Sequence, residues 1–185
     1  MTLVLIGVLA VVLVFAAVLF NGLIAKRQMV KNGWADIDVQ LKRRADLVPQ
    51  LVSVVQGYAA HERQLFEDIA AKRTQALAAG DDPARRGASE TEFARPIGKL
   101  IAVAEAYPQL KASQNFLELQ NALADTENKI EMARRFYNGA VRELNTAVET
   151  VPANMVAGIA GIHSAPFFQI GEAEAATPQV SLSAP

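Results

Sequence analysis

The chain opens with a long apolar stretch. From Leu3 to Phe20 no side chain is charged or strongly polar, and the run continues to Ala25 with two interruptions. A helix of this length is roughly 33 Å long at 1.5 Å per residue, enough to span the hydrocarbon core of a bilayer. A cleaved signal peptide would need a basic region ahead of a shorter apolar core, and none is present. We therefore predict an uncleaved transmembrane anchor at residues 1–25.

A short basic segment, residues 26–33, follows the anchor directly and contains Lys26, Arg27 and Lys31. Basic residues close to a membrane span stay on the cytoplasmic side. This rule predicts that the amino terminus lies outside the cell and that the rest of the chain lies in the cytoplasm. The same three side chains are at the right depth to contact anionic lipid headgroups.

Beyond this segment, apolar residues recur in steps of three and four from Trp34 to Ala59, which is typical of one face of an amphipathic helix. Helical character continues to Gly80, so the first helix is predicted at about residues 34–79. The turn residues of "GDDPARRGAS" then predict a surface loop at residues 80–89.

Pro49 lies in the middle of this first predicted helix. It either kinks one continuous helix or sits in the first turn of a new helix capped by Asp46. The apolar stripe keeps its phase across Pro49, which favours the kink. A continuous helix of about 45 residues would be roughly 70 Å long, and we interpret it as a stalk that carries a bundle away from the membrane.

Two further helices are predicted. The second covers about residues 90–107 and ends before Pro108, and the third covers residues 113–151 and ends before Pro152. The apolar segment at residues 152–170 is interrupted by glycines and must be buried against the bundle, the membrane surface or another subunit.

The third helix has the most regular pattern in the chain. From Phe116 to Val151 the apolar and small residues keep a seven-residue repeat, and Val141 and Val148 widen the stripe beyond a two-stranded seam. This favours an antiparallel bundle over a free coiled coil. We therefore predict an all-α fold, in which an N-terminal transmembrane helix precedes an antiparallel up-and-down bundle at residues 34–151. Residues 171–185 are predicted to be a tail.

Composition narrows the function classes. The chain has 185 residues, of which 51% are hydrophobic and 20% charged, so it has room for one domain besides the anchor. The net charge of −1 gives no overall attraction to nucleic acid, and no nucleic-acid partner is expected. The chain contains no cysteine, which excludes disulfides, thiolate nucleophiles and sulfur-ligated metals.

No motif predicts a reaction. His61 and Glu62 begin a zinc-protease pattern, but no second histidine follows at the required spacing. Glu127 and Glu131 share a helix face, but basic neighbours make a solvated charge network the better interpretation. The sequence therefore predicts no enzyme, no catalytic residue, no metal site and no cofactor.

One stretch of the first helix is a candidate interaction face because it combines charged residues with the single tryptophan of the chain. Its basic residues can bind phosphate or lipid headgroups, although such runs are more often the solvated side of a helix. The face comprises Trp34, Asp38, Arg43, Arg44 and Asp46.

Three long motifs resemble the LemA family of bacterial membrane proteins. They are "WADIDVQLKRRADLVPQLVSVVQGYAAHE", "AYPQLKASQNFLELQNALADTENKIEMARRFYNGAVRELN" and an ending of the form P-x-N-x-V-A…G…PFF. The resemblance covers nearly all of residues 30–168. It implies a single N-terminal span in the bacterial cytoplasmic membrane and an up-and-down helical bundle. It brings no established reaction or catalytic residue.

Two functional expectations follow. The first is a membrane-anchored scaffold that self-associates into a homo-oligomer, because its helices carry more apolar faces than a lone bundle needs. The alternative is an adaptor for a membrane protease or another membrane enzyme. The candidate contacts are then the charged stretch at residues 36–46 or the predicted loop at residues 80–89.

Overall fold

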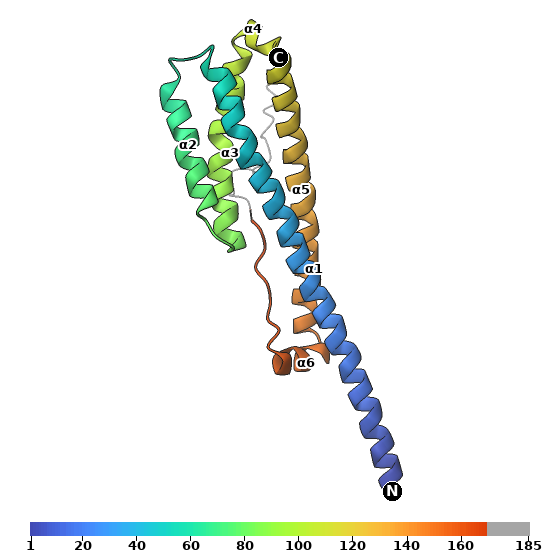
Figure 1. Ribbon diagram of the computed structural model, residues 1–185. Helices are drawn as coiled ribbons and strands as arrows, with labels where there is room; N and C mark the ends of the chain where they lie inside the picture. Colours follow the sequence, from blue (N-terminus) through green and yellow to red (C-terminus); the bar gives the residue numbers. More distant parts are fainter. Residues whose placement is uncertain (170–185) are drawn as a thin grey trace, which may run out of the picture. The chain divides into compact units, whose positions relative to one another are not determined.

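The computed structural model describes residues 1–169, and the predicted tail at residues 171–185 lies outside this range. The described chain is entirely helical apart from turns and one extended segment, as Figure 1 shows, so the predicted all-α fold is confirmed. The helices are α1 (Thr2–Gln56), α2 (Arg63–Leu77), α3 (Pro83–Glu105), α4 (Pro108–Lys111), α5 (Gln114–Glu149) and α6 (Ala153–Ala160).

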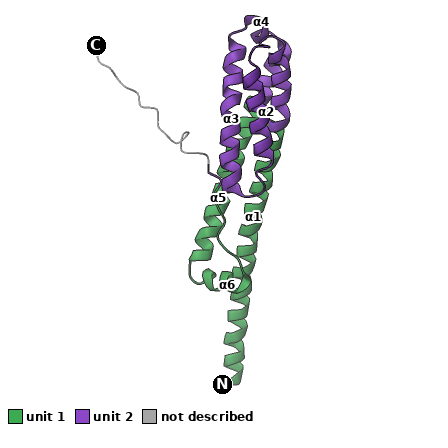
Figure 2. Ribbon diagram, turned by 90° about the vertical axis from the view of Figure 1, so that its left-hand side faces the viewer, with its two compact units in different colours: residues 1–44, 124–167 green, residues 45–123, 168–185 purple. Residues whose placement is uncertain are grey.

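The chain divides into two compact units, coloured separately in Figure 2. Unit 1 contains residues 1–44 and 124–167, and unit 2 contains residues 45–123 together with the last described residues, Phe168 and Gln169. Helices α1 and α5 each contribute residues to both units.

Unit 2 is a helical bundle around one apolar core. The end of α1, helices α2, α3 and α4, and the start of α5 each turn one apolar face inward, which is how amphipathic helices remove their apolar stripes from water. The buried core residues are Ala45, Val48, Leu51, Val55, Ala59, Phe66, Ile69, Ala76, Phe93, Ile97, Leu100, Ala104, Leu110, Phe116 and Leu123.

Helix α1 continues through Pro49, as the unbroken phase of the apolar stripe indicates. Pro49 itself is exposed, while Val48 and Leu51 on either side of it are fully buried. The ring therefore lies on the outer face of the helix, away from the core.

The prediction of one helix over residues 34–79 is wrong in its second half. The interpretation of these residues as one continuous stalk is therefore also wrong. Helix α1 ends at Gln56, and a turn leads into α2, which begins at Arg63. The apolar spacing could not reveal the break, because Ala59 within the turn and Phe66 after it are buried in the same core as the end of α1.

The predicted loop at residues 80–89 is also wrong, because α3 begins at Pro83. Asp82 caps this helix, and its carboxylate accepts hydrogen bonds from the backbone N–H groups of Ala84 at 2.9 Å and Arg85 at 3.3 Å. Proline is well suited to the first turn of a helix, where its missing N–H would have no partner. The turn-like composition thus marks the start of a helix.

Unit 1 is built on an antiparallel pair of helices, the first part of α1 and the second part of α5. The cross-contacts are Lys26 with Glu143, Gly33 with Tyr137, and Arg44 with Glu127. As the residue number on α1 rises from 26 to 44, the number of its partner on α5 falls from 143 to 127, so the two helices are antiparallel. The two numbers in each pair add to about 170. Besides Arg44, the pair buries Leu23, Val30, Ile37, Leu41, Thr126, Ile130, Tyr137, Ala140, Val141 and Leu144.

The third predicted helix is confirmed within two residues at each end, as α5. The apolar segment predicted after it contains the short helix α6, which ends at Gly161 in the left-handed conformation with φ of 63°. The chain then continues in an extended form, which we call the strap, residues 162–169. The hydroxyl of Tyr137 donates to the carbonyl of Pro166 at 2.8 Å and so attaches the strap to α5.

Candidate functional site

The first part of α1 exposes its apolar side chains on all sides. The large apolar residues from Leu3 to Phe20 are exposed, except Leu19, which is half-buried, and Leu23 is the first to be buried. Within the described residues, α1 is the one helix long and apolar enough to cross a membrane, judged by length and composition. An exposed apolar surface of this extent is unfavourable in water, so a bilayer is its natural surrounding.

The three basic residues predicted to contact lipid headgroups follow this stretch on α1. Arg27 and Lys31 are exposed and lie one helical turn apart, so they share a face. The ammonium of Lys26 lies 2.9 Å from the carboxylate of Glu143 on α5. The structure therefore places two exposed cations on one face after the apolar stretch, and a third in an ion pair.

Trp34 lies inside the α1–α5 packing. Its ring centroid is 5.7 Å from that of Tyr137, and the two ring planes are tilted by 55°. The neighbouring Gly33 allows this close approach, because a Cβ there would lie 3.1 Å from the Phe136 ring and from the Tyr137 backbone. Trp34 is half-buried and serves to join the two helices.

Arg44 is also internal. Its side chain is 5% exposed, and its Nη1 donates to both carboxylate oxygens of Glu127, at 3.0 and 3.1 Å. A buried guanidinium requires such a partner, because an uncompensated charge in the interior is very costly. Arg44 therefore holds α1 against α5 and is not part of an open surface.

Arg43 belongs to an exposed charge network beside this pair. Its Nη2 lies 3.7 Å from the carboxylate of Asp125, which also accepts a hydrogen bond of 2.8 Å from Lys129. The Lys129 hydrogen bond lowers the pKa of Asp125, and the charges of Lys129 and Arg43 act in the same direction. Residual burial opposes them by raising the pKa.

The five residues of the predicted interaction face do not form one surface. Asp38 and Arg43 are exposed in unit 1, whereas Trp34 and Arg44 take part in helix packing. Asp46 belongs to unit 2, where it lies 3.7 Å from Arg73. An interaction surface on this part of α1 is thus reduced to its exposed charged residues.

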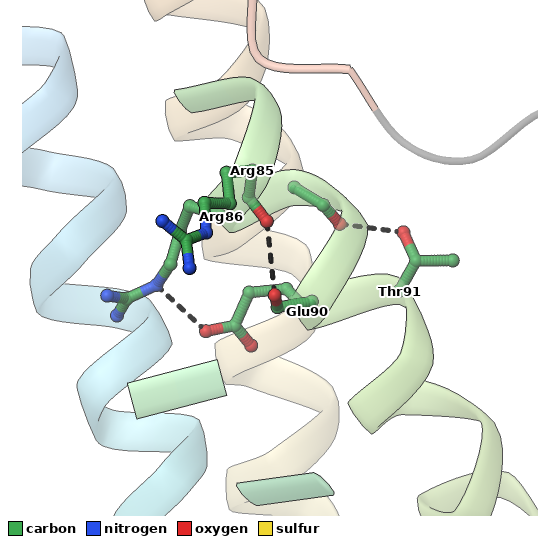
Figure 3. Close-up of polar contacts among 6 residues, drawn as sticks. Arg85, Arg86, Glu90 and Thr91 are labelled. Atoms are coloured by element: carbon green, nitrogen blue, oxygen red, sulfur yellow. Dashed lines mark hydrogen bonds and ion pairs between the residues drawn. The ribbon is translucent and has the colours of Figure 1, made fainter. Parts of the chain in front are cut away.

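Sequence reasoning missed a buried ion pair on α3. Figure 3 shows the guanidinium of Arg86 and the carboxylate of Glu90 facing each other from successive turns, with Nε and Oε1 separated by 3.1 Å. Both residues are buried. The sequence signal for this pair is an arginine and a glutamate four residues apart, soon after the Asp82–Pro83 start of the helix. A pair of this kind is costly to break but adds little stability by itself.

The same end of α3 receives the end of the strap. Gly87 is buried, and a Cβ on it would collide with the backbone carbonyl of Gln169. Phe168, which precedes Gln169 in the chain, is buried in unit 2. The absence of a side chain at Gly87 is therefore what admits the strap backbone.

No group of three histidine, aspartate or glutamate side chains in residues 1–169 is arranged to hold a metal ion. His61 lies beside the hydroxyl of Tyr107 at 3.2 Å, with its ring exposed at the surface of unit 2. A hollow on that unit is lined by charged side chains, among them Glu62, Asp68 and Lys99, and by the apolar Leu65 and Val103.

Comparison with known proteins gives consistent results. The sequence model of the LemA family matches residues 33–182. Magnetosome protein MamQ 2 of Paramagnetospirillum magneticum is 26% identical over 95% of this chain and 75% of its own length. Magnetosome protein MamQ of Magnetospirillum gryphiswaldense is 22% identical over 87% and 70%. Protein LemA of Metamycoplasma hominis is 24% identical over 83% and 70%.

Proposed function

Because the chain belongs to the LemA family and its first helix is long and apolar enough to cross a bilayer, we propose that it is a non-catalytic helical scaffold, anchored in the bacterial cytoplasmic membrane, where it self-associates. The anchor is the apolar part of α1, and the scaffold is formed by the helices that follow. The basic residues after the span support a cytoplasmic position for these helices, by the positive-inside rule.

The observation that carries this proposal is the continuity of α1. The helix runs without a break from the exposed apolar stretch to residues buried against α5, and both belong to unit 1. A linker would leave the cytoplasmic helices free to move relative to the span. An unbroken helix instead fixes the packed part of unit 1 next to the bilayer.

Exposed apolar residues outside the span support self-association. Met29 and Val39 on α1, and Met132 and Phe136 on α5, are large and exposed in unit 1. Met132 and Phe136 lie one turn apart and so share a face of α5. A second copy of the chain would remove these side chains from water, and confinement to one membrane raises the chance of encounter.

Chemical crosslinking tests self-association directly, because the natural chain contains no cysteine. A single cysteine at Met132 or Val39 can then join two copies only through identical positions. We expect Met132→Cys and Val39→Cys to form dimers with a short bis-maleimide in isolated membranes. Arg63→Cys, at an exposed charged position on α2, is the matched control and should stay monomeric.

The same experiment addresses the alternative role as an adaptor for a membrane protease or another membrane enzyme. That role is favoured by the charged residues Asp38 and Arg43, which remain exposed on α1. Self-crosslinked dimers support the scaffold. Monomers throughout, together with a stoichiometric crosslink from Asp38→Cys to one other membrane protein, would reject the scaffold in favour of the adaptor.

A further inference from the structure

The short helix α6 has an apolar face that nothing in unit 1 covers. Met155 and Ile159 lie four residues apart on one face of α6, and the exposed Val151 lies in the turn before the helix; these three residues are called the stripe. The exposed fractions of Val151, Met155 and Ile159 are 73%, 68% and 91%. Among the exposed large apolar residues of the described chain, only Met1 is more exposed than Ile159.

The opposite side of α6 is packed against the rest of unit 1. Ala157 and Ile162 are buried, and the N–H of Ile162 donates to the carbonyl of Ala157 at 2.9 Å. The helix is therefore held in a defined orientation with its stripe turned outward. Residues 151–169 contain no Asp, Glu, Lys or Arg, so no charge opposes contact with an apolar surrounding.

The register of unit 1 shows where this stripe lies along α1. The antiparallel contacts run from Arg44 with Glu127 to Lys26 with Glu143. Continued to the end of α5, the same register brings Glu149 to the height of Asn21. Asn21 directly follows the exposed apolar stretch of α1 and lies in the last turns of the predicted anchor, so α6 begins close to the height where the membrane span ends.

The figures agree with this placement. In both views α6 lies beside α1 and runs across its direction (Figures 1 and 2). A helix that crosses a membrane span at the level of its end lies in the plane of the bilayer surface. Short apolar-faced helices in this position bury one face at the boundary between headgroups and acyl chains.

We propose that α6 is an interfacial helix, whose stripe of Val151, Met155 and Ile159 inserts into the cytoplasmic leaflet beside the span. This inference rests on the proposed anchoring by α1. The occupant of the stripe is lipid rather than another protein, because the stripe continues the membrane surface that α1 already defines. It gives unit 1 a second attachment, which limits tilting of α1 in the bilayer.

Fluorescence quenching in reconstituted vesicles tests the proposal with the full-length chain. Single cysteines at Met155 and Ile159 carry an environment-sensitive fluorophore in phosphatidylcholine vesicles that contain lipids brominated near the headgroup end of the acyl chain. Phosphatidylcholine alone is used so that the signal reports apolar insertion and not attraction between charges. Two variants serve as references, Val11→Cys within the span and Arg135→Cys on the exposed side of α5.

We expect the labels at 155 and 159 to lose roughly half or more of their fluorescence, while the label at 135 is unaffected. Deeply brominated lipids should quench the label at 11 most strongly. If the label at 11 is quenched and those at 155 and 159 report water or lack lipid quenching, the interfacial helix is wrong and the anchor stands. If the label at 11 reports water, the anchor itself is wrong.

Discussion

The side-chain amide of Asn145 on α5 pairs with the backbone of Ala165 in the strap through two hydrogen bonds. Its Nδ2 donates to the Ala165 carbonyl at 3.0 Å, and its Oδ1 accepts from the Ala165 N–H at 2.8 Å. A single side chain thus satisfies both polar groups of one extended residue, in the manner of a neighbouring β-strand. This pairing holds the chain that follows α6 against α5.

Asn145→Ala should therefore loosen the strap. It removes two partly buried hydrogen bonds and leaves the backbone of Ala165 without them, at an expected loss of about 1–3 kcal/mol. Limited proteolysis of the full chain in detergent should cut between residues 161 and 169 faster than in the natural protein. Arg142→Ala, on the same helix and exposed, provides the comparison, and equal cleavage of the two variants would contradict the role of Asn145.

Two glycines of α3 should respond in opposite ways to the same substitution. Gly87→Ala brings a Cβ into the carbonyl of Gln169, so it should displace the strap and lower the apparent melting temperature. Gly98→Ala meets nothing within 4 Å and should stabilise the helix by about 0.5–1 kcal/mol. Thermal unfolding followed by circular dichroism measures both. Equal stability of Gly87→Ala and Gly98→Ala would contradict the close contact between Gly87 and the Gln169 carbonyl.

The ion pair of Arg44 and Glu127 should matter far more than an exposed pair. Glu127→Ala leaves a guanidinium that is 5% exposed without its bidentate partner, and we expect a loss of about 2–4 kcal/mol. Glu67→Ala removes the partner of the exposed Arg63 and should cost about 0–0.5 kcal/mol. Urea unfolding of both variants gives the difference. Similar midpoints would show that Arg44 does not depend on Glu127.

The lowered pKa of Asp125 predicts a dependence of stability on acid. Its hydrogen bond from Lys129 and the charge of Arg43 stabilise the carboxylate in the folded chain. This contribution is present above the pKa of the unfolded chain, about 3.9, and is lost as the pH falls through the lower pKa of the folded chain. The melting temperatures of the natural protein and Asp125→Asn should therefore differ at neutral pH and converge below about pH 4.

Much of the fold could be predicted from local patterns. The apolar stripe of α5 fixed that helix within two residues, since seven-residue spacing and the flanking Ser113 and Pro152 point to the same limits. The break between α1 and α2 could not be found in this way. Ala59 and Phe66 keep the apolar spacing across the turn, so only the packing of α2 against the same core reveals the reversal.

The candidate site was harder to predict than the fold. Arg43 and Arg44 are adjacent and chemically identical, yet one is exposed beside Asp125 and the other is buried on Glu127. The register of α1 against α5 decides which of the two arginines is buried. The pattern of residues along one helix does not reveal that register. From the sequence, the stripe on α6 could be recognised only as part of an apolar segment. Its exposure depends on the packing of Ala157 and Ile162.

Native mass spectrometry of the chain released from membrane vesicles tests the central claim most directly, because it measures chain length and copy number together. We predict that every chain retains the apolar helix from Thr2 onward, and that the released species has the mass of two or more complete chains. A water-soluble species with the mass of a single chain that begins after residue 25 would contradict both the anchor and the scaffold.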